Sequence, residues 1–561
     1  MSRLSCLFRA SCAYAALLAG CPSAFAQSAN PLPEVVVTAT GGGSLTQPGV
    51  VQQRQELNKT AGSVGFVDSE SFKDRYTNNL HDVLKDTPGV LVQERYGQEL
   101  RLSIRGSAIS RAFHGRGIEV LQDGIPFNNA DGSSDFYQID PLALRSIEVY
   151  KGGNGLAYES SYLGGAVNFV TPTAYTAIAP NILRFDGGSW GTARGNIQAS
   201  RVLGNFDGLV NATYSHSDGY RDHARQDYQH YNANFGYRIN PNVETRFWLG
   251  NYITNQKLPG SLTLADAINN PRMAAASAVT GDQARDVRLE RISNRTTIRF
   301  DNGRLDLDSW AMHKNLYHPI FQVLDQDGWT YGFAPRYIGN FNIAGHRNEL
   351  IAGVRYFGGS NKALQFLNVA GSRGAQTLNA VQDANNYQAF AENRFYFLPT
   401  VALMTGAKIL RDERTYTDFG GLALNPVRKF DSRAYEGFNP KVGLLWEPQR
   451  DIQVFTNLTR SQDIPDFTDL AQTVATTTKF VPLAAQRAWT AEVGTRGNVD
   501  RFAWDVTLYR SQFQDELLQF VVGPGVPAST FNAPRTVHQG VELAWLSKSG
   551  ATSPVYRAAT N

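Results

Sequence analysis

The chain has 561 residues, of which 42% are hydrophobic and 18% charged, and its formal net charge is +3 at pH 7. This near-neutral balance offers no general electrostatic argument for a nucleic-acid partner. No apolar run reaches the roughly 20 residues that a helix needs to cross a bilayer, which excludes helical membrane spans. A transmembrane β-strand is not excluded, because it needs only about 10 residues and every second one can be polar.

Residues 1–26 have the pattern of a secretory signal peptide. Two arginines and an apolar stretch over residues 13–19 precede the small-x-small sequence SAFA, which predicts cleavage after Ala26. The alternative is lipoprotein processing at the sequence LAGC, with acylation of Cys21. All three cysteines lie in this segment, so cleavage leaves a chain with neither a disulfide framework nor a Cys-ligated metal site.

Residues 27–48 form a short leader that contains one isolated run of strand-forming residues. The sequence EVVVTAT at residues 34–40 lies between a proline-rich stretch and three glycines, so it has no neighbouring strand to pair with. Only seven residues separate the predicted cleavage site from Glu34, which leaves no room for a further folded domain before this run.

Residues 49–172 mix helical and strand patterns, which predicts a compact α+β domain. Apolar residues at helical spacing predict a helix over Ser71–Leu84, which ends at the breaker sequence DTPG. Glycine-punctuated segments predict short strands at residues 90–92, 101–104, 118–122, 146–150 and 166–170.

Residues 173–561 predict a transmembrane antiparallel β-barrel. In YQHYNANFGYRI (228–239), Tyr231 and Phe235 share one face while His230 and Asn234 share the other. A soluble sandwich would alternate in the same way, but the signal peptide, the aromatic residues near segment ends and the sustained repetition favour a membrane barrel. The same period occurs at residues 243–252, 349–358, 400–410, 441–448, 451–460 and 501–510.

Three blocks of the first half resemble the plug domain of TonB-dependent outer-membrane receptors in order and spacing. They are LHDVLKDTPGVLVQERYGQELRLSIRGS (80–107), GIEVLQDGIPFNNADG (117–132) and IDPLALRSIEVYKGGNGLAYESSYLGGAVNFVTPT (139–173). Three later segments resemble barrel segments of the same family, with most similarity to receptors for ferric siderophores or ferric citrate. They are GGSWGTARGNIQASRV (187–202), SHSDGYRDHARQDY (215–228) and AEVGTRG (491–497).

The resemblance implies a monomeric transporter in the outer membrane of a Gram-negative bacterium. Its plug would fill a barrel of 22 strands, and it would import a ligand without catalysis, cofactor or resident metal. Outer-membrane lipid would surround the barrel, and TonB with its inner-membrane complex would supply the energy. The unpaired run would be the TonB box, able to add to a sheet edge of TonB through main-chain hydrogen bonds. Its core would be Glu34, Val35, Val36, Val37, Thr38 and Ala39.

The resemblance also implies an ionic lock between plug and barrel. Arg105 and Lys151 match plug positions where the family favours basic side chains, and Glu492 and Glu542 match their partners on the barrel wall. Buried ion pairs contribute little net stability but determine how two bodies dock. Lysine in place of arginine at position 151 weakens any bidentate pairing. The alternative is that all four are ordinary solvated charges of the lumen.

Ligand contacts in this family come from outward-facing plug loops and lumen-facing barrel residues. Arginines there would suit an anionic ferric chelate through charge-assisted hydrogen bonds, and aromatic rings could stack on it. For each such residue the alternative is a solvated loop position. The predicted ligand-binding residues are Arg95, Tyr96, Gln98, Arg111, Phe113, His114, Arg116 and Asn128.

The length of residues 173–561 departs from the family pattern. It supplies material for roughly 16–18 strands, at about 22–25 residues per strand with its connections. The last clear strand ends near Trp545, and the sequence LSKSGATSPVYRAATN after it does not alternate. We therefore expect a C-terminally truncated chain with an open strand edge, whose unpaired backbone groups would be costly in lipid.

The sequence thus predicts TonB-dependent uptake of a ferric siderophore or a ferric citrate-type chelate. A receptor of the same family for cobalamin, another metal chelate or a sugar remains open. A substrate-specific diffusion porin would share the alternating strands but would need neither box nor plug. A non-transporting adhesin or a defective remnant is favoured by the short C-terminus.

Overall fold

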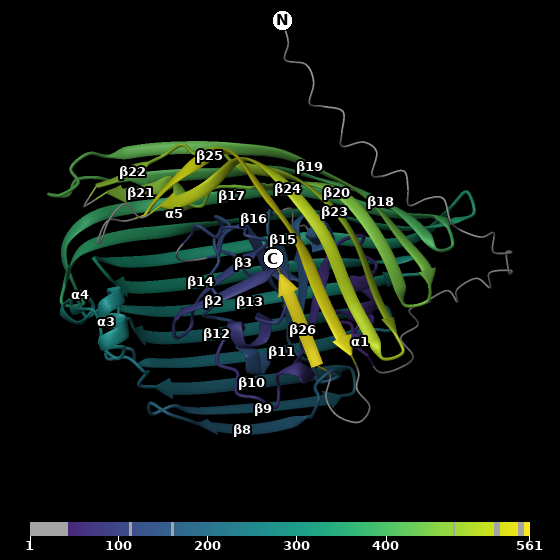
Figure 1. Cartoon of the computed structure of the whole chain (residues 1–561), viewed down its shortest axis with the longest axis horizontal. Coiled ribbons are helices and arrows are strands. Elements are labelled where there is room, and N and C mark those ends of the chain that lie inside the picture. The colour runs from purple at the N-terminus through teal and green to yellow at the C-terminus, as the bar shows by residue number, and fades with distance from the viewer. Residues whose placement is uncertain are drawn as a thin grey trace, which may run out of the picture. The chain divides into compact units, whose positions relative to one another are not determined.

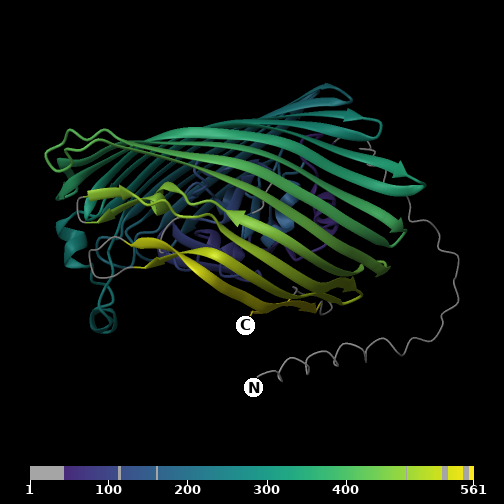
Figure 2. The same cartoon turned by 90° about the horizontal axis from the view of Figure 1, so that it is seen from above.

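The computed structural model describes residues 43–111, 115–158, 162–474, 477–520, 528–547 and 555–560, which belong to one compact unit. The predicted signal peptide and TonB box, together with Phe113 and His114, lie outside these ranges. An N-terminal plug is surrounded by the strands of a β-barrel in both views (Figure 1, Figure 2).

The plug is built on a five-stranded sheet with the order β1-β6-β7-β4-β5, in which only the β4–β7 pair is parallel. Strands β4, β6 and β7 are buried along their whole length, which explains why their sequences do not alternate. A separate hairpin is formed by β2 and β3. The plug elements are α1 Val50–Asn58, β1 Val64–Asp68, η1 Ser69–Ser71, α2 Leu80–Leu84, β2 Val90–Tyr96, β3 Glu99–Ile104, β4 Ile118–Gln122, β5 Ile125–Pro126, η2 Pro141–Ala143, β6 Ser146–Lys151, η3 Gly152–Tyr158 and β7 Gly165–Val170.

The five short strands predicted for the plug are confirmed, but the helix predicted over Ser71–Leu84 is wrong for most of its length. Only α2, Leu80–Leu84, is helical. The side chain of Asn79 accepts a hydrogen bond from the His81 N–H at 2.9 Å, so the helix begins there. The apolar residues before Asn79 instead belong to a turn that buries Phe72, which is 3% exposed.

Among the described residues, the barrel wall has 17 strands that follow one another in chain order from β8 to β26, and each strand is antiparallel to the next. This confirms the expected range of 16–18 strands. The expectation of no strand after Trp545 is wrong, because β25 continues to Ser547 and a short β26 follows. The wall strands are β8 Asn181–Gly187, β9 Ala193–Leu203, β10 Phe206–Ser217, β11 Gln226–Asn240, β12 Val243–Lys257, β13 Ala284–Phe300, β14 Gly303–Pro319, β15 Gln322–Ile343, β16 His346–Val369, β17 Ser372–Leu398, β18 Val401–Asp418, β19 Lys429–Gln449, β20 Ile452–Asp463, β23 Gln486–Val499, β24 Phe502–Phe520, β25 Ser529–Ser547 and β26 Val555–Thr560.

Alternation along the wall strands separates an apolar outer face from a polar inner face. In β11, Tyr231 and Tyr237 are 44% and 50% exposed on the outside, whereas His230 and Asn234 are 1% and 2% exposed against the plug. The plug therefore meets the wall mainly through polar side chains. None of the described helices is long and apolar enough to cross a bilayer.

The two ends of the barrel differ in their connections. At one end, called here the short-turn end, two-residue turns join strands, as at residues 241–242, 301–302 and 344–345. The other end, called the insertion end, carries the helices and the extra hairpin on the left of Figure 1. These insertions are α3 Leu264–Asn269, α4 Ala276–Thr280, α5 Phe467–Leu470, β21 Ala471–Val474 and β22 Thr477–Phe480.

Candidate functional site

Four buried charges join the plug to the barrel wall, and we call this cluster the lock. The guanidinium of Arg105 donates to Glu542 through Nε and Nη2 at 2.9 and 3.0 Å, and to Glu492 through Nη1 at 2.5 Å. Lys151 Nζ donates to Glu542 Oε2 at 3.1 Å. None of the four residues is more than 9% exposed. The structure thus brings together all four residues that the sequence assigned to a plug–barrel contact.

Neutral plug groups complete the hydrogen bonding of the lock. Ser63 donates its backbone N–H to Glu492 at 3.0 Å and its hydroxyl to Glu542 at 2.8 Å. The Asn154 amide donates to both oxygens of Glu492 at 3.1 Å. Burial alone would lower the pKa of Arg105, but the two glutamates outweigh it and raise that pKa above its ordinary value. Charge and hydrogen bonding are therefore balanced inside the contact, as a buried ion pair requires.

Backbone geometry on the plug positions the guanidinium in the lock. Arg105 has a φ of 54°, an unfavourable left-handed conformation for a residue with a side chain, and its N–H donates to Gly89 O at 2.9 Å. Gly89 itself has a φ of 74°, and a Cβ there would lie 2.0 Å from Glu542 Oε1. Glycine is required at this turn both for its backbone conformation and for the close approach of the glutamate.

A second contact, called here the anchor, holds the first described residues at the short-turn end. Glu244 on β12 accepts hydrogen bonds from Ser44 Oγ at 2.6 Å, from the Leu45 N–H at 2.8 Å and from Thr46 Oγ1 at 2.8 Å. Arg246, two residues along the same strand, donates to Thr46 Oγ1 at 3.0 Å. The carboxylate thus binds the segment that follows the predicted TonB box in sequence.

A third contact, made of ion pairs, joins a plug loop to the insertion between β20 and β23. Arg111 Nη1 donates to Asp466 at 2.5 Å, and Arg116 Nη1 donates to Asp469 at 2.7 Å. Burial raises the pKa of Asp466. Burial would also raise that of Asp469, but Arg116 and Arg111 outweigh it and lower the Asp469 pKa. The two arginines are at most 1% exposed, so their charges are compensated within the protein.

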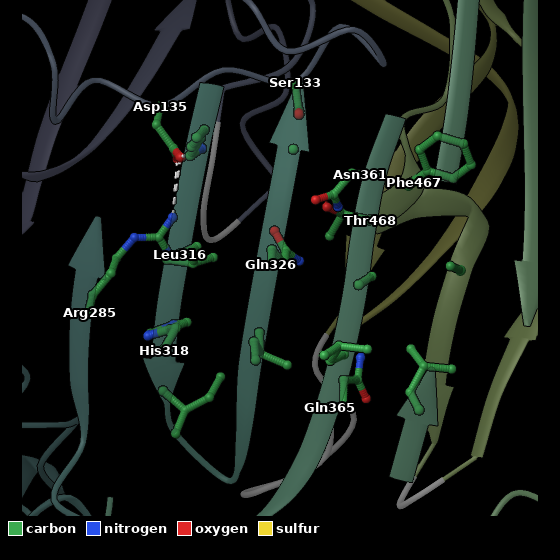
Figure 3. A pocket seen from close by; sticks show the side chains of 18 of the residues that line it. Ser133, Asp135, Arg285, Leu316, His318, Gln326, Asn361, Gln365, Phe467 and Thr468 are labelled. Carbon is green, nitrogen blue, oxygen red and sulfur yellow. Dashed lines mark hydrogen bonds and ion pairs between the residues drawn. The ribbon is translucent and has the colours of Figure 1, made fainter. Parts of the chain in front are cut away.

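A cavity of about 780 Å³ lies between the plug and the strands at the insertion end (Figure 3). Its wall includes the tip of β2, the plug loop over residues 129–135, the inner faces of β14, β15 and β16, and α5. This volume lies within the range of small-molecule sites. Among the described residues, no group of three or more His, Cys, Asp or Glu side chains is arranged to bind a metal ion.

Of the predicted ligand-binding residues, Arg95 and Tyr96 line this cavity, while Gln98, Arg111, Arg116 and Asn128 are not among its lining residues. Gln98 Nε2 donates to Asn78 O at 3.1 Å. Asn128 donates to Ile118 O at 3.1 Å and accepts from the Val120 N–H at 2.8 Å, so it supports the plug backbone. Phe113 and His114 lie outside the described residues.

Several residues of these contacts were missed by sequence reasoning. Glu244 occupies one of many polar inward-facing positions, and alternation does not distinguish it from the others. Asp466 and Asp469 have the spacing of a helix cap, and the Asp466 side chain does cap α5, but the spacing says nothing about an arginine partner. The pair between Glu119 of the plug and Arg355 of β16, at 3.0 Å, also has no sequence signal.

Family models match most of the chain. The model described as TonB-dependent receptor plug domain matches residues 56–166, and the model described as TonB dependent receptor-like, beta-barrel matches residues 169–560. Among curated proteins, the vitamin B12 transporter of Vibrio vulnificus is 26% identical over 27% of this chain and 24% of its own length. The ferripyoverdine receptor of Pseudomonas aeruginosa is 24% identical over 39% of this chain and 28% of its own length. These alignments thus span about a quarter of each relative.

Solved structures show the same fold at low identity. An unliganded ferric citrate transporter superposes with a TM-score of 0.73 at 16% identity, over 88% of this chain and 76% of the other. The ferric yersiniabactin uptake receptor of Yersinia pestis superposes with a TM-score of 0.70 at 15% identity, over 90% of this chain and 80% of the other.

Removal of the lock arginine is expected to loosen the plug. Arg105→Ala leaves two buried glutamates with one lysine, and loss of one partner of a buried pair costs about 3–5 kcal/mol. We expect a lower unfolding temperature by calorimetry and greater sensitivity of expressing cells to large hydrophilic antibiotics. Arg411→Ala is the control, since that side chain is 56% exposed in its pair with Glu413. Equal behaviour of the two variants would contradict a role for the lock.

Removal of the anchor charge is expected to free the residues that follow the predicted box. Glu244→Gln replaces a charged acceptor, whose hydrogen bonds contribute about 1.5–3 kcal/mol each, with a neutral one. Hydrogen–deuterium exchange at the Leu45 amide should become about tenfold faster. Glu290→Gln, at an outer position where the side chain is 45% exposed, should leave that rate unchanged. An unchanged rate in Glu244→Gln would show that the anchor does not hold this segment.

Proposed function

The chain belongs to the TonB-dependent receptor family, and from this premise we propose that it imports a ferric chelate across the outer membrane of a Gram-negative bacterium. The ligand class is a ferric siderophore or a ferric citrate-type chelate. The observation that carries the proposal is that the plug holds a cavity at the insertion end while its lock and anchor fasten it to the wall.

Each contact has a place in the proposed cycle. The ligand binds in the cavity, in contact with the plug loop over residues 129–135 and with β14, β15 and β16. TonB pairs with residues 34–40 as an added strand and transmits a pull along the backbone. The anchor is the first described contact that this pull reaches along the chain, because Ser44, Leu45 and Thr46 follow the box.

The lock resists displacement of the plug, yet it can open without exposing a large apolar surface. Its residues are charged or polar, and so is most of the inner wall around the plug. Hydrogen bonds broken by pulling can be replaced by bonds to water that enters the lumen. A passage can therefore form by movement within the plug while the barrel keeps its strand pairing.

A cobalamin-type ligand is the second candidate. The similarity to a vitamin B12 transporter over 151 residues favours it. Two growth assays of cells with and without this chain distinguish the candidates. In one, iron is limiting and is supplied as ferric dicitrate or as a ferric trihydroxamate. In the other, cyanocobalamin is limiting. If the chain improved growth only when cyanocobalamin was limiting, the ligand would be a cobalamin and not a ferric chelate.

Proline in the predicted TonB box is expected to prevent uptake of the ligand while the ligand still binds. Neighbouring N–H groups of a strand point in opposite directions, so Val35→Pro combined with Val36→Pro removes one donor from each side. Of radioactive ferric dicitrate and ferric trihydroxamate, uptake of whichever chelate the unaltered chain imports should fall at least about tenfold, because the added strand loses its ladder. Val35→Thr with Val36→Thr, which keeps both donors, is the control. Unchanged uptake in the proline variant would favour a diffusion porin.

A further inference from the structure

The charges of the described residues that line the cavity cancel within the protein. Arg285 Nη2 lies 3.3 Å from Asp135 Oδ2, an ion pair drawn in Figure 3, and Lys314 donates to the same carboxylate. Arg95 Nη1 lies 3.4 Å from Glu99 Oε1. Each cation of the lining therefore already contacts a carboxylate. The charged residues of the described lining are three cations and three anions, Arg95, Arg285, Lys314, Glu99, Asp131 and Asp135.

The remaining arginines of the neighbouring plug loop add no charge to the cavity. Arg111 and Arg116 were expected to attract an anionic ligand, but they are paired with Asp466 and Asp469 and are at most 1% exposed. An anion that entered the cavity would have to lose hydration, and it would meet Arg285 and Lys314 already paired with the Asp135 carboxylate, whose charge repels it.

The lining instead offers neutral hydrogen-bonding groups. The half-buried amides of Gln326 on β15 and Gln365 on β16 line the wall (Figure 3), and neither side chain makes a hydrogen bond in the described part of the protein. Asn361 donates to Gln382 at 2.9 Å on the same wall. Amides both donate and accept, so they match carbonyl, amide and hydroxyl groups without requiring charge.

We propose, on the basis of the transport function above, that this cavity selects a ligand of zero net charge whose surface presents carbonyl, amide or hydroxyl groups. Among ferric chelates, a trihydroxamate has this property, because three monoanionic hydroxamates balance Fe³⁺. Ferric dicitrate and ferric tris-catecholate are anionic and do not match the cavity. Gln326 and Gln365 contact the ligand, and Asp135 sets the charge selection by neutralising Arg285 and Lys314.

The direct test is calorimetric titration of the purified full chain in detergent with a neutral ferric trihydroxamate, with ferric dicitrate and with a ferric tris-catecholate. The neutral chelate is expected to bind at least tenfold more tightly than either anion. Equal or tighter binding of an anionic chelate would overturn the inference, and so would the absence of saturable binding by the neutral chelate.

A charge variant tests the cause of the selection. Asp135→Asn keeps the shape of the side chain but leaves Arg285 and Lys314 without their carboxylate, so ferric dicitrate should bind at least fivefold more tightly, in a salt-sensitive way. Asp327→Asn, at an outer position where the side chain is 53% exposed, is the matched control and should leave both affinities unchanged. An unchanged ratio of affinities in the Asp135 variant, with heat-modifiable barrel mobility retained, would refute the role of that carboxylate.

A shape-matched variant tests the neutral contacts. Gln326→Leu combined with Gln365→Leu should weaken the ferric trihydroxamate at least fivefold. Its effect on ferric dicitrate should be less than twofold, because the anion does not use these amides. Equal weakening of both probes would indicate a general packing defect and would count against the proposal.

This inference rests on the proposed transport function, and measuring both binding and uptake shows which of the two fails. Box-dependent uptake of ferric dicitrate, with no preference for the neutral chelate, would overturn charge selection and leave transport intact. Selective binding of the neutral chelate without box-dependent uptake would keep the selection and overturn transport.

Discussion

The pairing of Arg105 with Glu492 and Glu542 is the interaction on which the arrangement of plug and barrel depends. A buried ion pair contributes little net stability compared with apolar side chains of the same size, but an unpaired buried charge is very costly. The pair therefore penalises every position of the plug except the one in which each charge meets its partner. A plug held by an apolar interface would be bound as firmly, but it would expose that surface whenever a passage opened.

Contacts that involve buried charges at other points give the plug further fixed positions. The anchor binds residues 44–46 to β12, the lock binds the plug to β23 and β25, and Arg111 with Arg116 binds α5 at the insertion end. A force applied at the N-terminal side meets these contacts one after another along the chain. Because the plug loop that binds α5 is followed by residues that line the cavity, a change at the ligand and a change at that contact involve the same stretch of backbone.

Local patterns predicted the wall well and the contacts between distant residues poorly. The period-2 alternation of residues 228–239 predicted both the strand and its two faces, because a half-buried strand imposes that period wherever it occurs. Spacing failed at Ser71–Leu84, where the side chain of Asn79 starts the helix late. Arg105 and Glu492 are 387 residues apart, so only resemblance to a family could pair them. No resemblance to a family motif pointed to Glu244, and many other polar residues of the wall also face inward.

The cluster of basic residues around Arg111 shows why sequence predicts the presence of a charge better than its availability. Two arginines in a predicted apical loop suggest an anion site, since residues 105–117 of that loop contain no Asp or Glu. Their carboxylates come from Asp466 and Asp469, more than 350 residues later, on an insertion that folds back over the plug. Coulomb attraction acts through space, so the charge offered to a ligand is what remains after the fold has paired its own ions. For the described lining of this cavity the remainder is zero, and neutral hydrogen-bonding groups remain to contact the ligand.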